Sequence, residues 1–318
     1  MRVPTSLTGE ATPIASPVRS ASIPKERRHR NTGATRPTIN LFYIPALLLF
    51  IGLVAYPLFR GLWVSTTNWN GYSATYRVTG LANYARLFTD PHVLSAFINT
   101  IVYGCGSTLL QNLIGLGFAL LLNSKFRGRT IGRTLIYLPV MIAPLIMGYI
   151  MYFFFRFENG ALNDVVGLFG HAPVDWLGNG PRAVVLITLT NTLQFVGVSM
   201  VIYLAGLQAI PAMYSEAAAL DGANQWQQFW HVTLPLLIPA ITSSIMINLI
   251  GGLKLFDVVM ALVGGQYPTN SLSTLINRTY FTTQEAGYAS AIGVVLFVFI
   301  MVISAFAQRF LTSREVEQ

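Results

Sequence analysis

Long apolar stretches separated by short polar segments dominate this chain. An α-helix needs about 20 consecutive apolar residues to cross a bilayer, and six stretches are long enough. They are Leu41–Trp63, Ala96–Leu122, Leu135–Phe155, Ala183–Leu207, Leu234–Val263 and Ala286–Ala307. Because lipid offers no hydrogen-bond partners, a spanning segment must satisfy its own backbone, as a helix does. The pattern predicts an all-α, polytopic membrane protein with six transmembrane helices within residues 41–310 and a short cytoplasmic tail over 311–318.

The composition supports this interpretation. Of the 318 residues, 53% are hydrophobic and only 10% are charged. Soluble domains carry about 25% charged residues, so a soluble fold of this composition would lack the groups to cover its own surface. The single cysteine, Cys105, excludes an internal disulfide. The net charge of +8 does not indicate nucleic-acid binding, because the basic residues stand at the edges of apolar runs and in one tail.

The distribution of Lys and Arg predicts the orientation in the membrane. With six spans, both termini lie on the same side. Thirteen Lys and Arg fall in the N-terminal tail, in the loop 123–134 and after the last span: Arg2, Arg19, Lys25, Arg27, Arg28, Arg30, Arg36, Lys125, Arg127, Arg129, Arg133, Arg309 and Arg314. The loops on the other side hold six: Arg60, Arg77, Arg86, Arg156, Arg182 and Arg278. Because cytoplasmic loops carry the excess of basic residues, both termini and the second and fourth loops are predicted to be cytoplasmic.

The first 40 residues form a separate segment. They are basic and rich in Ser, Thr and Pro, and they contain no sustained apolar run. A cleaved secretory signal would need such a run. We expect a disordered, basic cytoplasmic tail over residues 1–40 that is attracted to anionic lipid by its charge.

The outward loops are rich in aromatic residues, among them Trp69, Tyr72, Tyr76, Tyr84, Phe88 and Trp176. Aromatic side chains at this depth suit the headgroup region of a membrane. They also suit a docking surface for an external partner, and the sequence leaves both interpretations open.

Several spans contain prolines: Pro45, Pro57, Pro139, Pro144, Pro235 and Pro239. A proline bends a helix and frees a carbonyl group that neighbouring helices or water must satisfy. Bent helices are more typical of a bundle that encloses a pathway than of a passive anchor.

The fourth loop, Gln208–Thr233, is unusual because it contains two acids and no Lys or Arg. Pro211 suits the first turn of a helix, and Ser215 or the residues just before it suit a cap. Glu216 would then lie near the positive helix end. Three alanines propagate the helix with little bulk, and Gly222 suits a left-handed stop. The loop therefore predicts a short, thin helix able to enter a cleft on another protein.

A second helix follows in the same loop. Asn224 suits its N-cap. Trp226, Phe229 and Trp230 stand at spacings of three and four residues, so they predict one aromatic helix face.

The same loop resembles the EAA loop of the inner-membrane permeases of binding-protein-dependent ABC importers. The resemblance rests on Ile210-Pro211, on Glu216-Ala217-Ala218 followed by Asp221-Gly222-Ala223, and on Leu234-Pro235. It extends over Leu41–Phe310 and includes Gly80-Leu81 and Asn83-Tyr84 before the second span. Within that superfamily the chain is most similar to the sugar-uptake branch of maltose and multiple-sugar type, by Phe256-Asp257, Gly264-Gly265 and Gly287-Tyr288-Ala289. Gln266-Tyr267 stand where a further glycine is common in that branch.

The resemblance implies a bacterial inner-membrane permease that works by alternating access. Its partners would be a second, similar permease subunit, two cytosolic ATPase subunits and an extracytoplasmic solute-binding protein. The ATPase-coupling residues would be Glu216, Ala217, Ala218, Asp221, Gly222 and Ala223, on a helix that docks in a groove of the ATPase. Without the resemblance, a helical hairpin that packs on the membrane face explains the loop equally well.

Polar residues inside the spans are candidates for the substrate pathway, because a polar group in the membrane must face protein or water. They are Asn191, Gln194, Asn248, Lys254 and Asp257, and span two adds Asn99, Gln111 and Asn112. Amides suit the hydroxyl groups of a sugar, but they also serve as hydrogen-bonding contacts between helices. Lys254 and Asp257 are three residues apart, so on one helix they would share a face and could form an ion pair, with each other or with the partner permease.

The sequence contains no motif for a catalytic or metal site. None of its three lysines belongs to a P-loop, and none of its four histidines begins H-E-x-x-H. We expect a transport subunit that is not an enzyme and binds no cofactor, with ATP hydrolysed by a separate subunit. The alternatives are an importer of glycerol phosphate or another polar solute, an ion-gradient carrier and a structural scaffold.

Overall fold

The computed structural model describes residues 43–124 and 126–313. The predicted tail over residues 1–40, Lys125 and Arg314 lie outside the described residues. The chain divides into two units, residues 1–51 and 52–318. Helix α2 (Tyr43–Phe50) belongs to the first unit, and its side chains are exposed.

The second unit holds the remaining helices, and the secondary structure of the described residues is helical apart from an isolated bridge between Thr67 and Val78. The helices of the first half are η1 (Ile51–Ala55), α3 (Tyr56–Val64), α4 (Ala82–Thr89), α5 (Pro91–Ile101), η2 (Val102–Gly106), α6 (Ser107–Asn123), α7 (Arg129–Tyr137), η3 (Leu138–Met141) and α8 (Pro144–Phe155). The remaining ones are α9 (Ala161–Leu168), α10 (Gly180–Ala209), α11 (Ala212–Leu220), α12 (Gln225–Gln228), η4 (Phe229–Thr233), α13 (Leu234–Leu253), α14 (Asp257–Val263), α15 (Leu272–Phe281) and α16 (Ala286–Thr312).

Several of these segments join into helices long and apolar enough to cross a membrane. The described residues contain five: Tyr43–Val64, Pro91–Asn123, Gly180–Ala209, Gln225–Leu253 and Ala286–Thr312. The pair Arg129–Met141 and Pro144–Phe155 makes a sixth span if it is counted as one. The predicted all-α polytopic fold is confirmed, and each predicted apolar stretch overlaps one of these helices or the bent pair.

The third span is bent by 99° between η3 and α8. Pro144 opens α8, and the residue before a proline avoids the helical conformation, as Ala143 does with ψ of 136°. The Gln194 side chain donates a 2.9 Å hydrogen bond to the free carbonyl of Ile142. The predicted bend at the prolines is therefore confirmed, and a neighbouring helix satisfies the backbone at the break.

The fifth span departs from the prediction, which was one helix over Leu234–Val263. Helix α13 begins at Leu234 as predicted, and α12 and η4 extend the span back to Gln225, but the predicted end is wrong because the helix stops at Leu253. Lys254 takes the C-cap position after Gly251 and Gly252, and Phe256 leaves the helical region with φ of −128°. A separate helix, α14, then begins at Asp257.

The predicted ion pair between Lys254 and Asp257 is wrong for the same reason. A spacing of three residues brings side chains together only within one helix, and the helix ends between these two. No salt bridge joins them in the described part of the chain, where Arg86 and Glu285 form an ion pair of 2.8 Å instead.

Small residues set the helix spacing in the bundle. A Cβ atom on Gly252 of α13 would lie 2.9 Å from the Cα atom of Gly104 in η2. Gly115 of α6 meets Ser199 of α10, and Gly148 of α8 meets Ala261 of α14 at similarly short range. Helices without a hydrophobic drive between them associate through such close backbone contacts.

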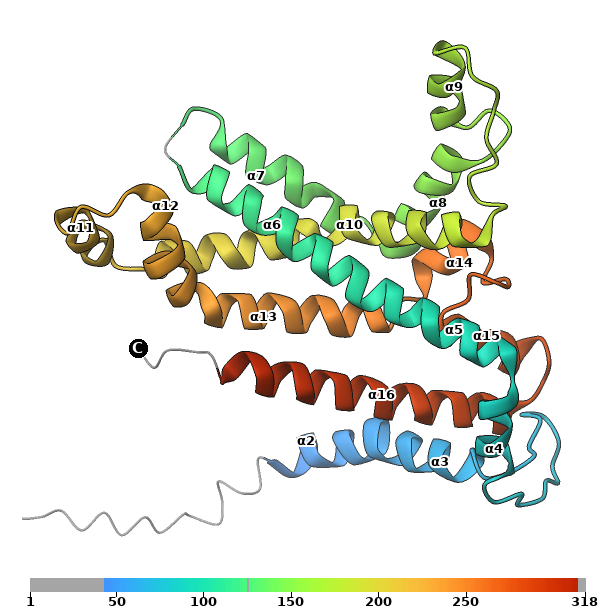
Figure 1. The fold of residues 1–318 in the computed structure, drawn as a ribbon. Coiled ribbons are helices and arrows are strands. Elements are labelled where there is room, and N and C mark those ends of the chain that lie inside the picture. Colours follow the sequence, from blue (N-terminus) through green and yellow to red (C-terminus); the bar gives the residue numbers. More distant parts are fainter. Residues whose placement is uncertain (1–42, 125, 314–318) are drawn as a thin grey trace, which may run out of the picture. The chain divides into compact units, whose positions relative to one another are not determined.

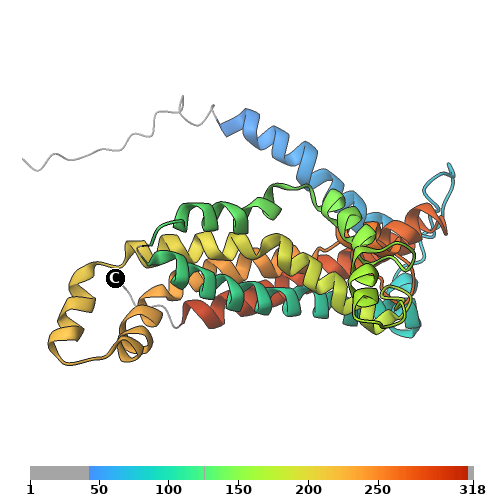
Figure 2. The ribbon, with the colours of Figure 1, turned by 90° about the horizontal axis from the view of Figure 1, so that it is seen from above.

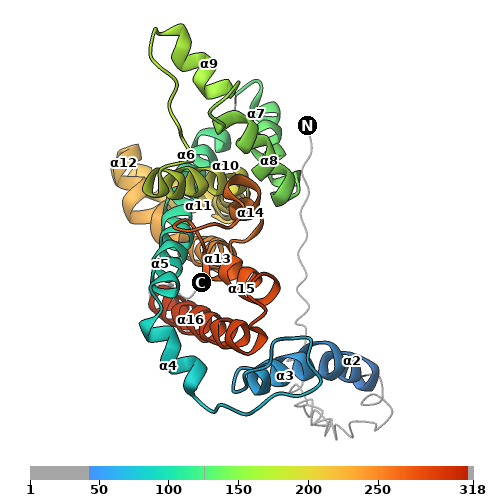
Figure 3. The same ribbon diagram turned by 90° about the vertical axis from the view of Figure 1, so that its right-hand side faces the viewer.

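The two ends of the second unit differ (Figure 1). Helices α11 and α12 project from the end at which α16 stops and the α6–α7 connection turns, whereas α4, α9 and α15 lie at the opposite end. Figure 2 shows the same opposition at a right angle, with α11 and α12 in gold at one end and α9 in green at the other. Figure 3 looks onto the end that carries α9 and α15. We refer to it as the outer end and to the α11 end as the inner end.

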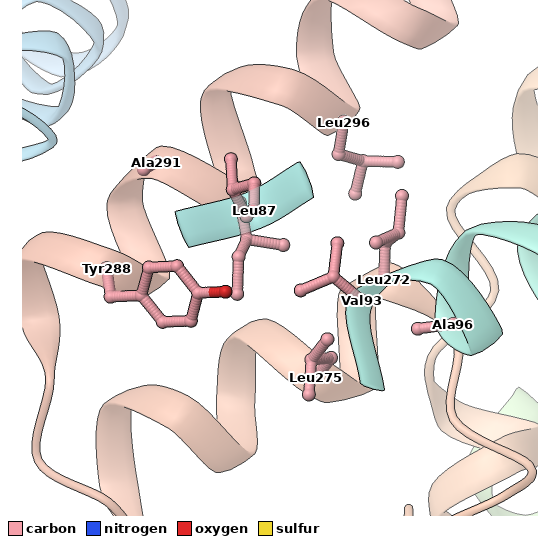
Figure 4. Packing of buried hydrophobic residues seen from close by; sticks show 9 residues of the cluster. Leu87, Val93, Ala96, Leu272, Leu275, Tyr288, Ala291 and Leu296 are labelled. Carbon is pink, nitrogen blue, oxygen red and sulfur yellow. The ribbon is translucent and has the colours of Figure 1, made fainter. Parts of the chain in front are cut away.

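A cluster of buried hydrophobic residues lies at the outer end (Figure 4). Its buried residues come from α4, α5, α15 and α16: Leu87, Val93, Ala96, Leu272, Leu275, Tyr288, Ala291, Ile292 and Leu296. The Asn83 side chain holds the preceding loop, since it donates 2.8 Å hydrogen bonds to the carbonyl groups of Ser65 and Thr67. The Glu285 carboxylate binds Arg86 through two hydrogen bonds and raises the pKa of that guanidinium. The outward loops are thus folded structure that the hydropathy pattern did not predict.

The close approach of Gly252 to Gly104 yields a stability prediction. We expect Gly252→Ala to lower the free energy of unfolding by about 1–3 kcal/mol, because the added methyl group forces two backbones apart. Gly251→Ala is the matched control, since a Cβ atom at Gly251 meets no atom within 4 Å. It should leave stability unchanged or raise it by up to about 1 kcal/mol through helix propensity. Thermal unfolding of the two purified variants in detergent checks this; equal melting temperatures would contradict it.

Candidate coupling helix and solute pathway

Helix α11 is a nine-residue helix at the inner end, and none of its residues is buried. Pro211 takes the N-cap position with φ of −61° and ψ of 135°, so the helix starts directly after it. The prediction of a short helix here is confirmed, although Pro211 precedes its first turn and does not lie within it as predicted.

Two details at the start of this helix were predicted wrongly. Ser215 lies inside the helix, where its hydroxyl donates 2.8 Å to the Ala212 carbonyl, so it caps nothing. Glu216 is the fifth of the nine residues and not part of the first turn. Both errors arise because Pro211 sets the helix start at Ala212, ahead of the position that the serine suggested.

The predicted stop at Gly222 is confirmed. Gly222 has φ of +82°, a conformation that glycine adopts without the usual steric cost. The Ala223 amide donates to the Ala218 carbonyl at 2.9 Å, and the Gly222 amide donates to Ala219 at 3.0 Å. This pair of hydrogen bonds is the Schellman motif. It ends α11 at a defined residue and leads the chain into α12.

Helix α12 begins at the predicted cap. The Asn224 side chain accepts from the Gln227 amide, and the Gln227 side chain accepts from the Asn224 amide, both at 2.9 Å. Trp226, Phe229 and Trp230 contact one another, with ring centroids 5.4–6.1 Å apart. The predicted aromatic face is confirmed. However, α12 is not a separate helix, because η4 joins it directly to α13.

The six residues predicted to contact the ATPase lie together on this hairpin. Glu216, Ala217, Asp221 and Gly222 are exposed, while Ala218 and Ala223 are half-buried. Two apolar side chains that the sequence argument did not select accompany them: Leu220 is 90% exposed and Met213 is 65% exposed. The sequence could have indicated these two residues, because apolar side chains in a loop that is expected to be exposed are candidates for an interaction surface.

A cavity of about 280 Å³ lies between α6, α10 and α13. Four of the five predicted pathway residues line it: Asn191, Asn248, Lys254 and Asp257. Gln194 does not line it, because its side chain is fully buried and bonded to the Ile142 carbonyl. For Gln194 the structure favours the alternative role, a contact between helices.

The cavity combines polar and aromatic groups. The Asn248 amide nitrogen donates 2.7 Å to the Ser199 hydroxyl, and the Gln111 amide nitrogen donates 2.9 Å to the Asn191 carbonyl. Phe195 and Phe256 also line the cavity. Such a lining offers hydrogen bonds and flat apolar surface to a neutral polar solute. Among the described residues no cluster of three or more His, Cys, Asp or Glu suits a metal ion.

Comparison with known proteins identifies the family. Residues 111–315 match the family described as binding-protein-dependent transport system inner membrane component. The probable starch degradation products transport system permease protein AmyD of Thermoanaerobacterium thermosulfurigenes is 34% identical over 281 residues, which cover 87% of this chain and 94% of that protein. The multiple sugar-binding transport system permease protein MsmF of Streptococcus mutans serotype c is 32% identical, over 83% of this chain and 91% of that protein.

The fold agrees with a solved structure. A bacterial ABC transporter involved in the import of the acidic polysaccharide alginate has a chain that superimposes with a TM-score of 0.75 at 23% identity, covering 87% of this chain and 95% of that one. The resemblance inferred from the EAA loop is therefore confirmed by sequence relatives that cover most of the chain. This chain belongs to the family of binding-protein-dependent transport system inner membrane components.

Proposed function

We propose that this chain is the membrane-spanning permease subunit of an ABC importer that moves a sugar of disaccharide or oligosaccharide class into the cytoplasm by alternating access. The observation that carries the proposal is α11, an exposed helix that bears the EAA residues and ends in a Schellman turn. The printed names of the relatives describe transport of starch degradation products and of multiple sugars. The amides and phenyl rings of the central cavity suit such solutes.

In this proposal α11 docks on a separate ATPase subunit. Its alanines keep it thin, and Met213 and Leu220 supply exposed apolar contact area. The hairpin is joined directly to the two helices that line the cavity, α10 before it and α12–η4–α13 after it. A displacement of α11 by the ATPase would therefore act on the cavity walls through continuous helices.

The inner end of the structure is then cytoplasmic. Arg127, Arg129, Arg133 and Arg309 all belong to this end, where the α6–α7 connection and the end of α16 lie (Figure 1). An excess of basic residues is typical of the cytoplasmic side. We propose a bacterial inner-membrane location, with both termini in the cytoplasm. The partners are a second permease subunit, two ATPase subunits that hydrolyse the ATP, and a solute-binding protein at the outer end.

An importer of glycerol phosphate is the second candidate within the same class. The cavity disfavours it, because Lys254 and Asp257 contribute opposite charges and leave the lining without a net positive charge for a phosphate dianion.

The coupling role of α11 is testable through its C-terminal turn. We expect Gly222→Val to reduce sugar uptake at least ten-fold in reconstituted vesicles, because a β-branched residue cannot hold φ of +82° and the hairpin must refold. Membrane insertion and solute-binding-protein affinity should stay at wild-type levels. The measurement is sugar-stimulated ATP hydrolysis together with uptake.

Gly128→Val is the matched control for this variant. Gly128 has φ of +98° and open space around its Cβ position, as Gly222 has, and it lies at the inner end outside the hairpin. It introduces the same backbone strain without altering α11. Undiminished uptake by Gly222→Val, or an equal loss of uptake in both variants, would refute the proposal that α11 couples the ATPase to transport.

The two buried amides on α10, Asn191 and Gln194, have different proposed roles, and substitutions can distinguish them. We expect Asn191→Leu to lower uptake efficiency about ten-fold without a change in melting temperature, since its side chain faces the cavity. Gln194→Leu should instead lower stability by about 1–2 kcal/mol, because the Ile142 carbonyl loses its hydrogen bond. Its uptake per folded molecule should match the wild type. Uptake and thermal unfolding of both variants check this, and a reversed pattern refutes the assignment of Asn191.

A further inference from the structure

A second polar cavity, of about 400 Å³, lies at the outer end between α14 and α15. Its lining includes Met260 and Gly264 from α14 and its C-cap, Gln266 from the loop that follows, and Thr274, Asn277 and Arg278 from α15. Figure 3 views this end, where α14 and α15 lie among the helix ends. Neither the coupling helix nor the central cavity accounts for this site.

Arg278 is held in place by stacking. Its guanidinium carbon lies 4.6 Å from the centroid of the Tyr267 ring, and the ring of Tyr267 stacks on His92 at 3.7 Å. Since the imidazole occupies one face of the ring, the guanidinium covers the other. Burial raises the pKa of the Tyr267 hydroxyl. The arginine is therefore positioned without a carboxylate partner.

The donors of this site are unused within the described chain. Arg86 binds Glu285, Arg156 binds the Asn159 carbonyl, and Arg182 binds the Asp175 carbonyl. In contrast, the guanidinium of Arg278 and the side-chain amides of Gln266 and Asn277 make no hydrogen bond to any described residue. The cavity thus gathers five guanidinium donors and two amides, each of which both donates and accepts.

One face of α14 connects this cavity to the central one. Asp257, Met260 and Gly264 follow at spacings of three and four residues, so they share a helix face. Asp257 lines the central cavity, whereas Met260 and Gly264 line the outer one. The opposite face of α14 is buried. Seven residues of helix rise about 10 Å, so the two cavities follow each other along one exposed helix face.

We propose that the outer cavity is a second solute subsite, which binds one sugar unit of an oligosaccharide while another unit occupies the central cavity. This inference rests on the proposed function. Arg278 donates to neighbouring hydroxyl groups, and the amides of Gln266 and Asn277 exchange hydrogen bonds with others. A longer oligosaccharide fills both cavities more completely than a disaccharide does, so the outer subsite should contribute most to the uptake of longer chains.

The mixed donor and acceptor lining favours hydroxyl groups over a carboxylate. A carboxylate only accepts hydrogen bonds, so it would leave the amide oxygens of Gln266 and Asn277 unpaired or facing a like partial charge. A hydroxyl group donates and accepts, and it satisfies both kinds of group. An acidic side chain of the solute-binding protein is therefore the weaker fit, and the experiment includes it as an outcome.

The test compares sugars of different length in the complete reconstituted importer. Uptake of maltose and arabinobiose is measured against the longer oligosaccharides of the same two series, for wild type, Arg278→Gln and Arg278→Lys. We expect Arg278→Gln to lower the uptake efficiency of the longer sugars about ten-fold, the scale of one lost charge-assisted hydrogen bond, with disaccharide uptake changed less than about two-fold. Arg278→Lys should recover only part of the loss, because an ammonium group lacks the planar fork.

Arg77→Gln is the matched control, because Arg77 is an exposed arginine of an outward loop that lines neither cavity. It removes the same charge and should not distinguish sugars by length. Thermal unfolding and solute-binding-protein affinity are measured for every variant.

Three outcomes overturn the inference. Equal loss for short and long sugars together with weaker affinity for the binding protein would assign Arg278 to docking. Unchanged uptake of all sugars by Arg278→Gln would show that the cavity is only solvated surface. Uptake of disaccharides by the wild type, without uptake of any longer sugar, would remove the need for a second subsite while leaving the proposed function intact. Absence of all sugar uptake by the wild type would refute the proposed function itself.

Discussion

The constraint on which this structure depends is that no backbone group inside a lipid bilayer can remain without a hydrogen-bond partner. The chain leaves the helical conformation at two places within apolar stretches, at Ile142–Ala143 and at Lys254–Phe256. Both breaks adjoin the same cavity, because Pro144 at the start of α8 and Lys254–Asp257 around the end of α13 line it. Irregular backbone at membrane depth is tolerated only where protein or a water-lined space satisfies it. The cavity therefore lies where the two spans leave the helical conformation.

The same constraint explains why two neighbouring amide side chains on α10, Gln194 and Asn191, make different contacts. Gln194 supplies a donor to the carbonyl that the first break frees, so its side chain is committed to the protein. Asn191, three residues earlier on α10, lines the cavity instead. Close helix packing at Gly104 and Gly252 brings η2 against the end of α13. The second break is thus supported by backbone contact on one side and open to the cavity on the other.

The sequence predicts the parts of this fold that lipid dictates and misses the parts that packing dictates. Each span was found because an apolar run of sufficient length has few alternatives in a membrane. The break in span five was missed because α14 is as apolar as α13, and Gly251-Gly252 is a weak signal in membrane helices, where glycine is common. Phe195 and Phe256 were missed as cavity residues. Within an apolar run, the sequence does not distinguish an aromatic residue that lines a cavity from one that faces lipid or packs between helices.

Local chemistry predicted the coupling hairpin more closely. Gly222 and Asn224 were placed correctly, because a left-handed turn and a capping box depend on a few adjacent residues. Ser215 was misplaced because a serine hydroxyl caps a helix or bonds within it, and only the start of the helix decides which. The outer subsite residues Gln266, Asn277 and Arg278 come from a loop and a helix that the hydropathy pattern treats as featureless connection, so no spacing argument brings them together.

The hairpin of α11 and α12 is acidic, although the neighbouring loop between α6 and α7 is basic. Near an anionic lipid surface each Lys or Arg contributes about 1 kcal/mol of attraction, which favours contact between the headgroups and the loop bearing Arg127, Arg129 and Arg133. The hairpin of α11 and α12 carries Glu216 and Asp221 and no Lys or Arg, so that attraction does not act on it. Its aromatic cluster lies at the membrane side of the hairpin, on the helix that continues into α13, while Met213 and Leu220 are exposed on α11. A segment that is anchored at its base, not attracted to lipid along its length and apolar on its exposed surface meets the physical requirements for binding a soluble protein at the membrane.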